Sequence, residues 1–179
     1  MIILWSNLCY NVKEGDDMKK NVIDNDVVVN SYYLVKKFKD SNKYITNLKL
    51  QKLMYFTECL YLAFDENLKN FFDCNWLAWD YGPVCRELYD RYSNFKINEI
   101  VLDDNCFELA NNLSERNKLV MDLIYVYFLD YEAFELVDIT HEEDSPWSYI
   151  YKSKQNEIIN KIKSRDWFKE RFKDIFDSE

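Results

Sequence analysis

The chain has 179 residues and a formal net charge of −9, and 48% of its residues are hydrophobic. It contains two glycines and two prolines, where average usage would give about 12 and 9. Phosphate-binding loops, dinucleotide-binding loops and tight hairpins need glycine where the backbone dihedral φ is positive. The composition therefore excludes those nucleotide-binding classes, disfavours a hairpin-rich β-sandwich or barrel, and predicts a compact, mainly helical, aromatic-rich domain.

Two helices are predicted in the first third of the chain. Asp24 or Asp26 is placed to cap a helix over residues 27–39, in which apolar side chains recur at helical spacing. A second helix over residues 47–64 carries apolar side chains at intervals of three and four residues along its whole length. It is the clearest helix in the sequence, and its regular apolar spacing predicts buried core.

The middle of the chain is predicted to alternate extended and helical segments. Residues 71–79 are short and aromatic, which favours an extended segment. Gly82 and Pro83 are expected to open a third helix. The first N–H group of a helix has no hydrogen-bond partner inside the helix, so proline, which has no N–H group, is favoured at that position. Residues 99–109 are predicted to form two short strands around a turn at 103–105.

The last third of the chain is predicted to be helical. A fourth helix follows Ser114, a short helix covers residues 131–140, another helical turn starts at Ser145, and a closing helix runs over residues 157–176. No linker divides these elements. The predicted fold class is therefore mainly α: a compact single-domain bundle of about six helices with a small two- or three-stranded β element.

The first 17 residues differ from the rest. Residues 13–17 back-translate to codons that can spell a ribosome-binding sequence just before the codon of Met18. We expect translation to start at Met18, which would make residues 1–17 an upstream addition and residues 18–179 the domain. The alternative is a genuine N-terminal arm that packs on the domain.

Charge is distributed unevenly along the sequence. Residues 99–144 contain 13 acidic residues against Arg116 and Lys118, a net charge of −11. Residues 19–52 contain eight lysines against three aspartates, a net charge of +5. One interpretation is two solvated faces of opposite sign. The other is an acidic surface that docks on a basic partner, for which the candidate residues are Asp103, Asp104 and Glu108, with Glu132 and Glu135 as further acids.

Cysteine and histidine usage predicts no metal site, cofactor or catalytic residue. The five cysteines are odd in number and widely spaced, which is not a disulfide framework, and a single histidine excludes a zinc site of the two-cysteine, two-histidine type. His141 precedes three acids and is expected to bond within the fold rather than to catalyse a reaction. Reduced thiols, the absence of a signal-peptide pattern and the lack of a long apolar run predict a cytoplasmic protein outside the membrane.

Three blocks of sequence resemble the Panacea domain family. Residues 45–56 (ITNLKLQKLMYF) resemble its first helix, residues 77–84 (LAWDYGPV) its central block, and Thr140-His141 with Pro146-Trp147 its last block. The blocks occur in the family's order. The matching positions to which the resemblance gives a structural role are Leu50, Gln51, Lys52, Leu53, Gly82, Pro83, Val84 and Thr140.

The resemblance implies a binding protein rather than an enzyme. Members of the family are similar to antitoxins that neutralise a co-encoded toxin, one relative is a proteolytic adaptor, and anti-defence roles in phages are a further possibility within the family. The implied function is a protein-binding inhibitor: an antitoxin, or an anti-defence protein that blocks a host effector such as a CRISPR nuclease. A groove lined by Trp79, Tyr81, His141 and Trp147 is the second candidate binding site.

Three other functions remain open from the sequence. The chain could be an adaptor that presents a client to a protease, a DNA-binding regulator that uses the lysines of residues 19–52, or an enzyme built around His141. We expect a protein partner, no small-molecule substrate, no membrane and no direct contact with nucleic acid.

Overall fold

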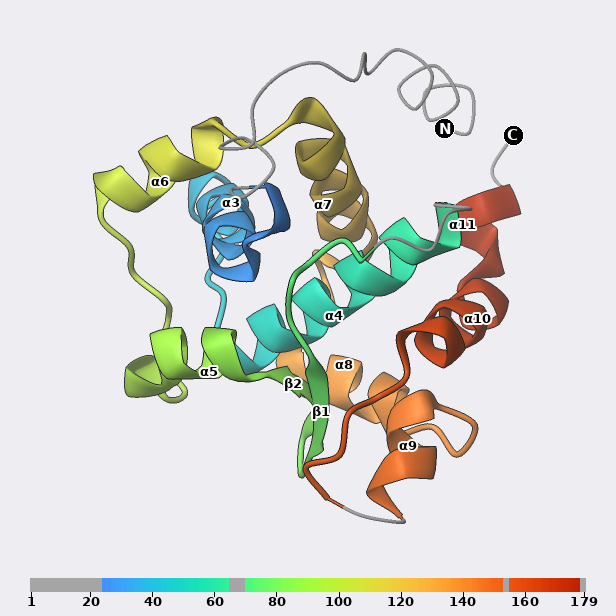
Figure 1. Ribbon diagram of the computed structural model, residues 1–179. Helices are drawn as coiled ribbons and strands as arrows, with labels where there is room; N and C mark the ends of the chain where they lie inside the picture. Colours follow the sequence, from blue (N-terminus) through green and yellow to red (C-terminus); the bar gives the residue numbers. More distant parts are fainter. Residues whose placement is uncertain (1–23, 65–69, 153–154, 178–179) are drawn as a thin grey trace.

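The computed structural model describes residues 24–64, 70–152 and 155–177, and confirms the mainly helical fold class. The predicted boundary at residues 1–17 lies outside these ranges. Figure 1 shows the described elements around α4 at the centre. In chain order they are α3 (Val27–Asp40), α4 (Asn47–Phe64), β1 (Trp76–Trp79), β2 (Gly82–Cys85), α5 (Arg86–Tyr92), the 3-10 helix η1 (Ser93–Phe95), α6 (Asp104–Asn111), α7 (Glu115–Phe128), α8 (Ala133–Thr140), α9 (Pro146–Tyr151), α10 (Lys161–Arg171) and α11 (Lys173–Asp177).

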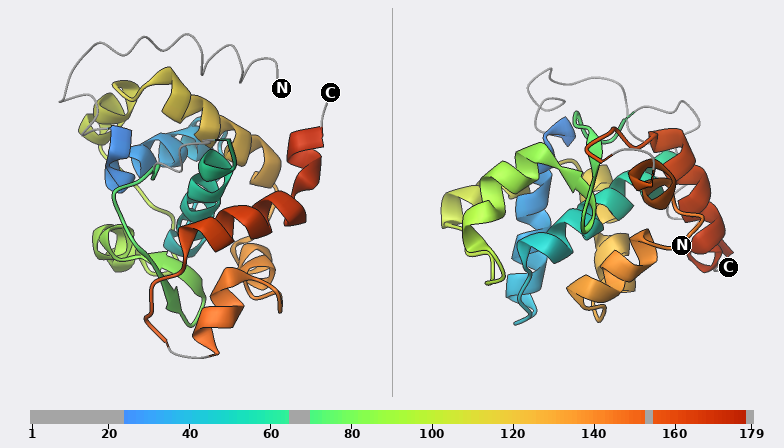
Figure 2. Two further views of the ribbon diagram at one scale, coloured as in Figure 1. Left: turned by 45° about the vertical axis from the view of Figure 1, so that its right-hand side comes forward. Right: turned by 90° about the horizontal axis from the view of Figure 1, so that it is seen from below.

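Helix α4 is the core of the domain. Helices α3, α7, α8 and α10 and strand β2 all pack against it, and the views in Figure 2 show it crossing the middle of the molecule. Its side chains are buried on every face, including that of Phe56, whose ring centroid lies 4.9 Å from Phe128 and 5.7 Å from Phe172. The predicted apolar side chains account for part of this burial, and the rest comes from polar side chains such as Gln51, Lys52 and Glu58, which are buried as well.

Helix caps fall where the sequence predicts them. The carboxylate of Asp26 accepts hydrogen bonds from the amides of Val28 (2.8 Å) and Val29 (3.1 Å) at the start of α3. The hydroxyls of Ser114 and Ser145 likewise accept amide hydrogens at the starts of α7 and α9. Each cap satisfies N–H groups that have no partner inside the helix.

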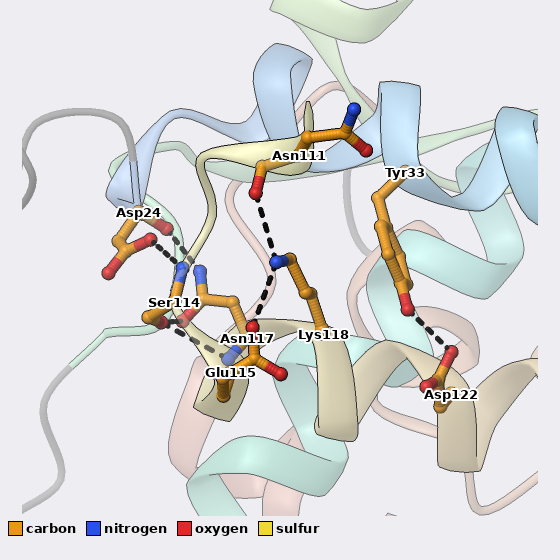
Figure 3. A network of polar contacts seen from close by, with 8 residues as sticks. All are labelled: Asp24, Tyr33, Asn111, Ser114, Glu115, Asn117, Lys118 and Asp122. Atoms are coloured by element: carbon orange, nitrogen blue, oxygen red, sulfur yellow. Dashed lines mark hydrogen bonds and ion pairs between the residues drawn. The ribbon is translucent and has the colours of Figure 1, made fainter. Parts of the chain in front are cut away.

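A polar network joins the start of α3 to α7 (Figure 3). Asp24 accepts the amide hydrogen of Ser114 on its carboxylate (2.8 Å) and the side-chain amide of Asn117 on its carbonyl (2.7 Å). Further along the same two helices, the hydroxyl of Tyr33 donates to Asp122 (3.0 Å). These contacts fix the angle between two helices that are distant in sequence.

The prediction of two strands over residues 99–109 is wrong, because this segment contains α6. Asp103 is the N-cap of that helix, and its carboxylate accepts the amide hydrogen of Cys106 at 3.0 Å. The side chains of Cys106, Phe107 and Ala110 are buried on the side of α6 that packs against α3. Aspartate and asparagine favour turns and helix caps alike, so an aspartate cap was mistaken for a hairpin turn.

The prediction that Gly82 and Pro83 open a helix is also wrong. Both residues belong to β2, which pairs antiparallel with β1 so that Trp79 faces Gly82, and α5 begins only at Arg86. Gly82 has a φ of +96°, which no α-helix contains. Proline is tolerated here because β2 is an edge strand.

The predicted closing helix over residues 157–176 begins later than expected. Residues 156–159 run beside β1 instead, where Ala78 donates its amide hydrogen to Glu157 (3.0 Å) and accepts that of Asn156 (2.9 Å). The helical part starts after the cap Asn160 and breaks near Phe172 into α10 and α11. Residues 156–159 therefore cover the edge of β1 that does not pair with β2.

Candidate functional site

The side-chain amine of Lys52 lies where residues from the three sequence blocks come together. Lys52 comes from α4, has no exposed surface, and donates a hydrogen bond from Nζ to the carbonyl of Pro83 at 2.8 Å. Among the described residues no carboxylate forms an ion pair with it. Because burial disfavours the charged form, the pKa of Lys52 is lowered to about 7.

Gln51 and Lys52 together cover the open edge of β2. The side-chain carbonyl of Gln51 accepts the amide hydrogen of Cys85 (2.9 Å), and its NH₂ group donates to the carbonyl of the same residue (3.3 Å). These bonds copy those of a neighbouring strand. The adjacent Gln-Lys pair of α4 therefore takes the place of a third strand on that side of the hairpin.

Gly82 lies where a side chain would collide with Lys52 of α4 and Thr140 of α8. A Cβ atom there would lie 2.5 Å from Oγ1 of Thr140 and 2.8 Å from Cε of Lys52. The Thr140 hydroxyl is itself held by a hydrogen bond to the carbonyl of Val137 at 2.8 Å. Close packing and the positive φ both require glycine at this position.

A stack of three rings fastens α9 to the hairpin turn. The His141 and Trp147 rings are parallel within 2° and 3.7 Å apart, and Tyr151 stacks on Trp147 at 4.5 Å. The indole N–H of Trp147 donates to the carbonyl of Trp79 (2.8 Å), and the Tyr151 hydroxyl donates to Asp80 (2.9 Å). The last sequence block thus holds the central block in place.

His141 caps the end of α8 and packs against Trp147. Burial is the main cause that lowers its pKa, and the positive charge of Lys52 lowers it further. Its Nε2 atom is buried and has no hydrogen-bond partner among the described residues.

We expect His141→Ala to lower the free energy of unfolding by about 1–2 kcal/mol, because it removes the stacked ring. His141→Phe keeps a ring of similar shape and should stay within about 0.5 kcal/mol of the wild type. Urea unfolding of both variants measures this. Equal stability of His141→Ala and the wild type would show that the stack is dispensable.

A groove of about 670 Å³ opens beside the hairpin. Trp79, Tyr81 and Tyr89 line it, with the Trp79 and Tyr89 ring centroids 4.9 Å apart in an edge-to-face contact. Two of the four residues predicted for a shared groove therefore meet there. His141 and Trp147 are not among the lining residues, because His141 at the end of α8 and Trp147 of α9 are stacked on each other.

Three polar residues of the groove have no signal in the sequence that marks them. Asn47 lines it with a buried side-chain oxygen that has no hydrogen-bond partner among the described residues. Lys96 and Asn156 line it with φ values of 54° and 63°. Non-glycine residues rarely adopt positive φ, and such strain concentrates at functional sites, but only the structure reveals it.

The structure does not bring the predicted acidic residues into one surface. Asp103, Asp104 and Glu108 belong to α6 and its cap, and α6 packs on α3. Glu132 is the N-cap of α8 and Glu135 belongs to that helix, which packs on α4 and β2, and Figures 1 and 2 show α6 and α8 well apart. The acidic stretch therefore forms separate patches.

Most of the lysines in residues 36–52 already have partners. Three of them form ion pairs with aspartates, and two are buried and donate to backbone carbonyls, so few remain to contact phosphates. The ion pairs are Lys36–Asp40, Lys37–Asp122 and Lys43–Asp130, and the buried residues are Lys49 and Lys52.

Some kinds of site do not occur in the described ranges. No group of three or more His, Cys, Asp or Glu side chains there could hold a metal ion. No helix in those ranges combines the length and the apolarity needed to cross a bilayer. Four cysteines in the same ranges, Cys59, Cys74, Cys85 and Cys106, are buried free thiols.

A match that covers more than half of the residues shows to which family the chain belongs. Residues 50–148 match the family described as "Antitoxin SocA-like, Panacea domain". The chain belongs to this family. The matched part of the Panacea domain contains Lys52, Gly82 and Thr140 and ends just after Trp147. No curated protein and no solved structure shows significant similarity to the chain.

Proposed function

We propose that this Panacea domain is a cytoplasmic antitoxin that binds a co-encoded toxic protein directly and neutralises it without catalysis. Membership of the antitoxin family carries the proposal. The groove beside the hairpin supplies a contact surface of suitable composition, since tyrosine and tryptophan contribute most to binding at protein interfaces.

The burial of the motif residues supports binding over catalysis. Lys52 has no exposed surface and the Nε2 atom of His141 is buried, so neither of these two nitrogens is open to a substrate. Their contacts hold the hairpin and α9 in place. What the fold presents to a partner is the surface that these residues position, including Tyr81 and Tyr89.

Co-expression with the product of the neighbouring gene tests the proposal. If that product is toxic, we expect the wild-type chain to restore growth and to co-purify with it at a fixed ratio. A proteolytic adaptor would instead remove the toxin only while a host protease is active, and an anti-defence inhibitor would protect an infecting phage. A toxic neighbour that kills equally with and without the chain would refute an antitoxin role.

Tyr89→Ala should weaken binding of the toxin at least 10-fold, because it removes an aromatic wall of the groove. The matched control is Tyr149→Ala, since Tyr149 is an exposed tyrosine of α9 and does not line the groove. Calorimetric titration with the purified toxin gives both affinities. Equal losses for the two variants would place the interface elsewhere.

A further inference from the structure

Two exposed aromatic side chains touch each other beside the hairpin turn. Tyr81 is 59% exposed and Phe134, at the start of α8, is 63% exposed. Their ring centroids lie 6.2 Å apart in an edge-to-face arrangement. Adjacent exposed rings form an apolar patch that favours contact with another molecule.

This apolar surface continues past the start of α8. Tyr44 and Ile97 are 63% and 88% exposed, and both line a hollow of about 380 Å³ that Ala133 closes from the α8 side. Ala133 precedes Phe134 directly. The pair Tyr81 and Phe134 and the pair Tyr44 and Ile97 therefore lie at the same end of α8.

Carboxylates surround these side chains. Glu135 and Asp138 are exposed on α8, and Asp138 lies one helical turn after Phe134. Asp80, Asp130 and Glu132 are also exposed and lie next to Tyr81 or ahead of α8. We call this surface the α8 patch: Tyr44, Tyr81, Ile97 and Phe134 with Asp80, Asp130, Glu132, Glu135 and Asp138.

The α8 patch keeps a net negative charge after its nearby cations are counted. Lys43 and Lys49 line the hollow, Lys43 forms an ion pair with Asp130, and Lys96, beside Ile97, lines the groove. Three lysines against five carboxylates leave a charge of −2. The patch therefore combines apolar contact area with a field that attracts cations.

We propose that the α8 patch is the docking surface for a basic segment of the protein partner, in which arginines flank an apolar side chain. This inference rests on the proposed function, because the partner is the toxin. A guanidinium can stack on an aromatic ring and pair with a carboxylate at the same time, and Phe134 with Asp138 offers both. The negative charge repels a second copy of the patch and the phosphates of nucleic acid alike.

Selection from a random 16-residue peptide display library tests the chemistry without a known partner. We expect the wild-type chain to enrich peptides that combine arginine with leucine or an aromatic residue. A synthetic peptide from that set should bind with an affinity that falls as salt concentration rises.

Two variants separate the apolar and charged contributions to binding. Tyr81→Ser with Phe134→Ser keeps every charge, and Glu135→Gln with Asp138→Asn keeps both rings; each should weaken binding of the selected peptide at least 10-fold. The matched control, Val126→Ser with Tyr149→Ser, changes two exposed apolar residues on α7 and α9 and should bind as the wild type does. Circular dichroism verifies that all three remain folded.

Several outcomes would overturn the α8 patch as a docking surface. These are enrichment of acidic or uncharged peptides, equal binding by all variants, or a dimer in solution that Phe134→Ser dissociates. The antitoxin role is tested separately: variants of the patch that still neutralise the toxin refute the docking surface and leave that role intact. Peptide capture without neutralisation supports the surface and refutes the role.

Discussion

We expect the substitution Gly82→Val to lower the free energy of unfolding by about 4 kcal/mol or more. A β-branched residue at a φ of +96° costs about 1–3 kcal/mol in backbone strain, and forcing atoms into a filled site costs about 1–3 kcal/mol more. The new Cβ atom would also push against the amine that bonds to Pro83. Urea unfolding followed by circular dichroism measures the loss, and a folded Gly82→Val protein of full stability would contradict it.

A double-mutant cycle locates the source of that loss. Gly82→Ala places a methyl group 2.5 Å from the Thr140 hydroxyl, and Thr140→Ala removes that hydroxyl. The double variant should be more stable than the sum of the single losses by about 1 kcal/mol or more, because contacting residues are not additive. Strictly additive losses would show that the Thr140 contact contributes nothing, and would leave the positive φ and the contact with Lys52 as the sources.

The second large effect is a dependence of stability on pH that comes from Lys52. Burial lowers its folded-state pKa to about 7 from the ordinary value of 10.5. Between those values the amine is neutral when folded and protonated when unfolded, so the unfolded state binds more protons and stability rises with pH. Relative to Lys52→Met, the wild type should gain about 1.4 kcal/mol per pH unit from pH 8 to pH 10.

The comparison with Lys52→Met is needed because other buried groups oppose this trend. Burial raises the pKa of the Cys59 thiol and the Tyr55 hydroxyl, so both remain protonated in the folded state and cost stability at alkaline pH. Those contributions are shared by the two proteins and cancel in the difference. Lys169→Met, which alters an exposed lysine of α10, should give a curve parallel to the wild type. A parallel curve for Lys52→Met would mean that its amine is charged in the folded protein.

Local chemistry made most of the helices predictable. Asp26, Ser114 and Ser145 are side-chain caps whose hydrogen bonds involve residues two or three positions away, so the sequence alone contains the signal. The apolar spacing of residues 47–64 predicts α4 for the same reason. The errors at residues 99–109 and 82–85 arise where one signal serves two structures, since aspartate suits a turn or a cap and Gly-Pro suits a turn or a helix start.

The candidate site was predictable in its residues but not in its arrangement. The motifs named Lys52, Gly82 and Thr140, yet their mutual contact joins α4, β2 and α8 across more than 80 residues. Exposure is likewise a property of the folded chain: Phe134 is exposed at the start of α8 whereas the apolar Leu136, Val137 and Ile139 are buried, and no local pattern marks it as a surface residue. The division of the acidic residues between α6 and α8 depends on the same long-range packing.

The hairpin is held on both edges, by Gln51 and Lys52 on the β2 side and by residues 156–159 on the β1 side. Tyr81 at its turn is therefore attached to a strand pair with little freedom to move before a partner arrives. Association that needs no reordering of the backbone loses less conformational entropy and proceeds close to rigid-body docking. Affinity at this surface would then be set chiefly by how slowly the partner dissociates.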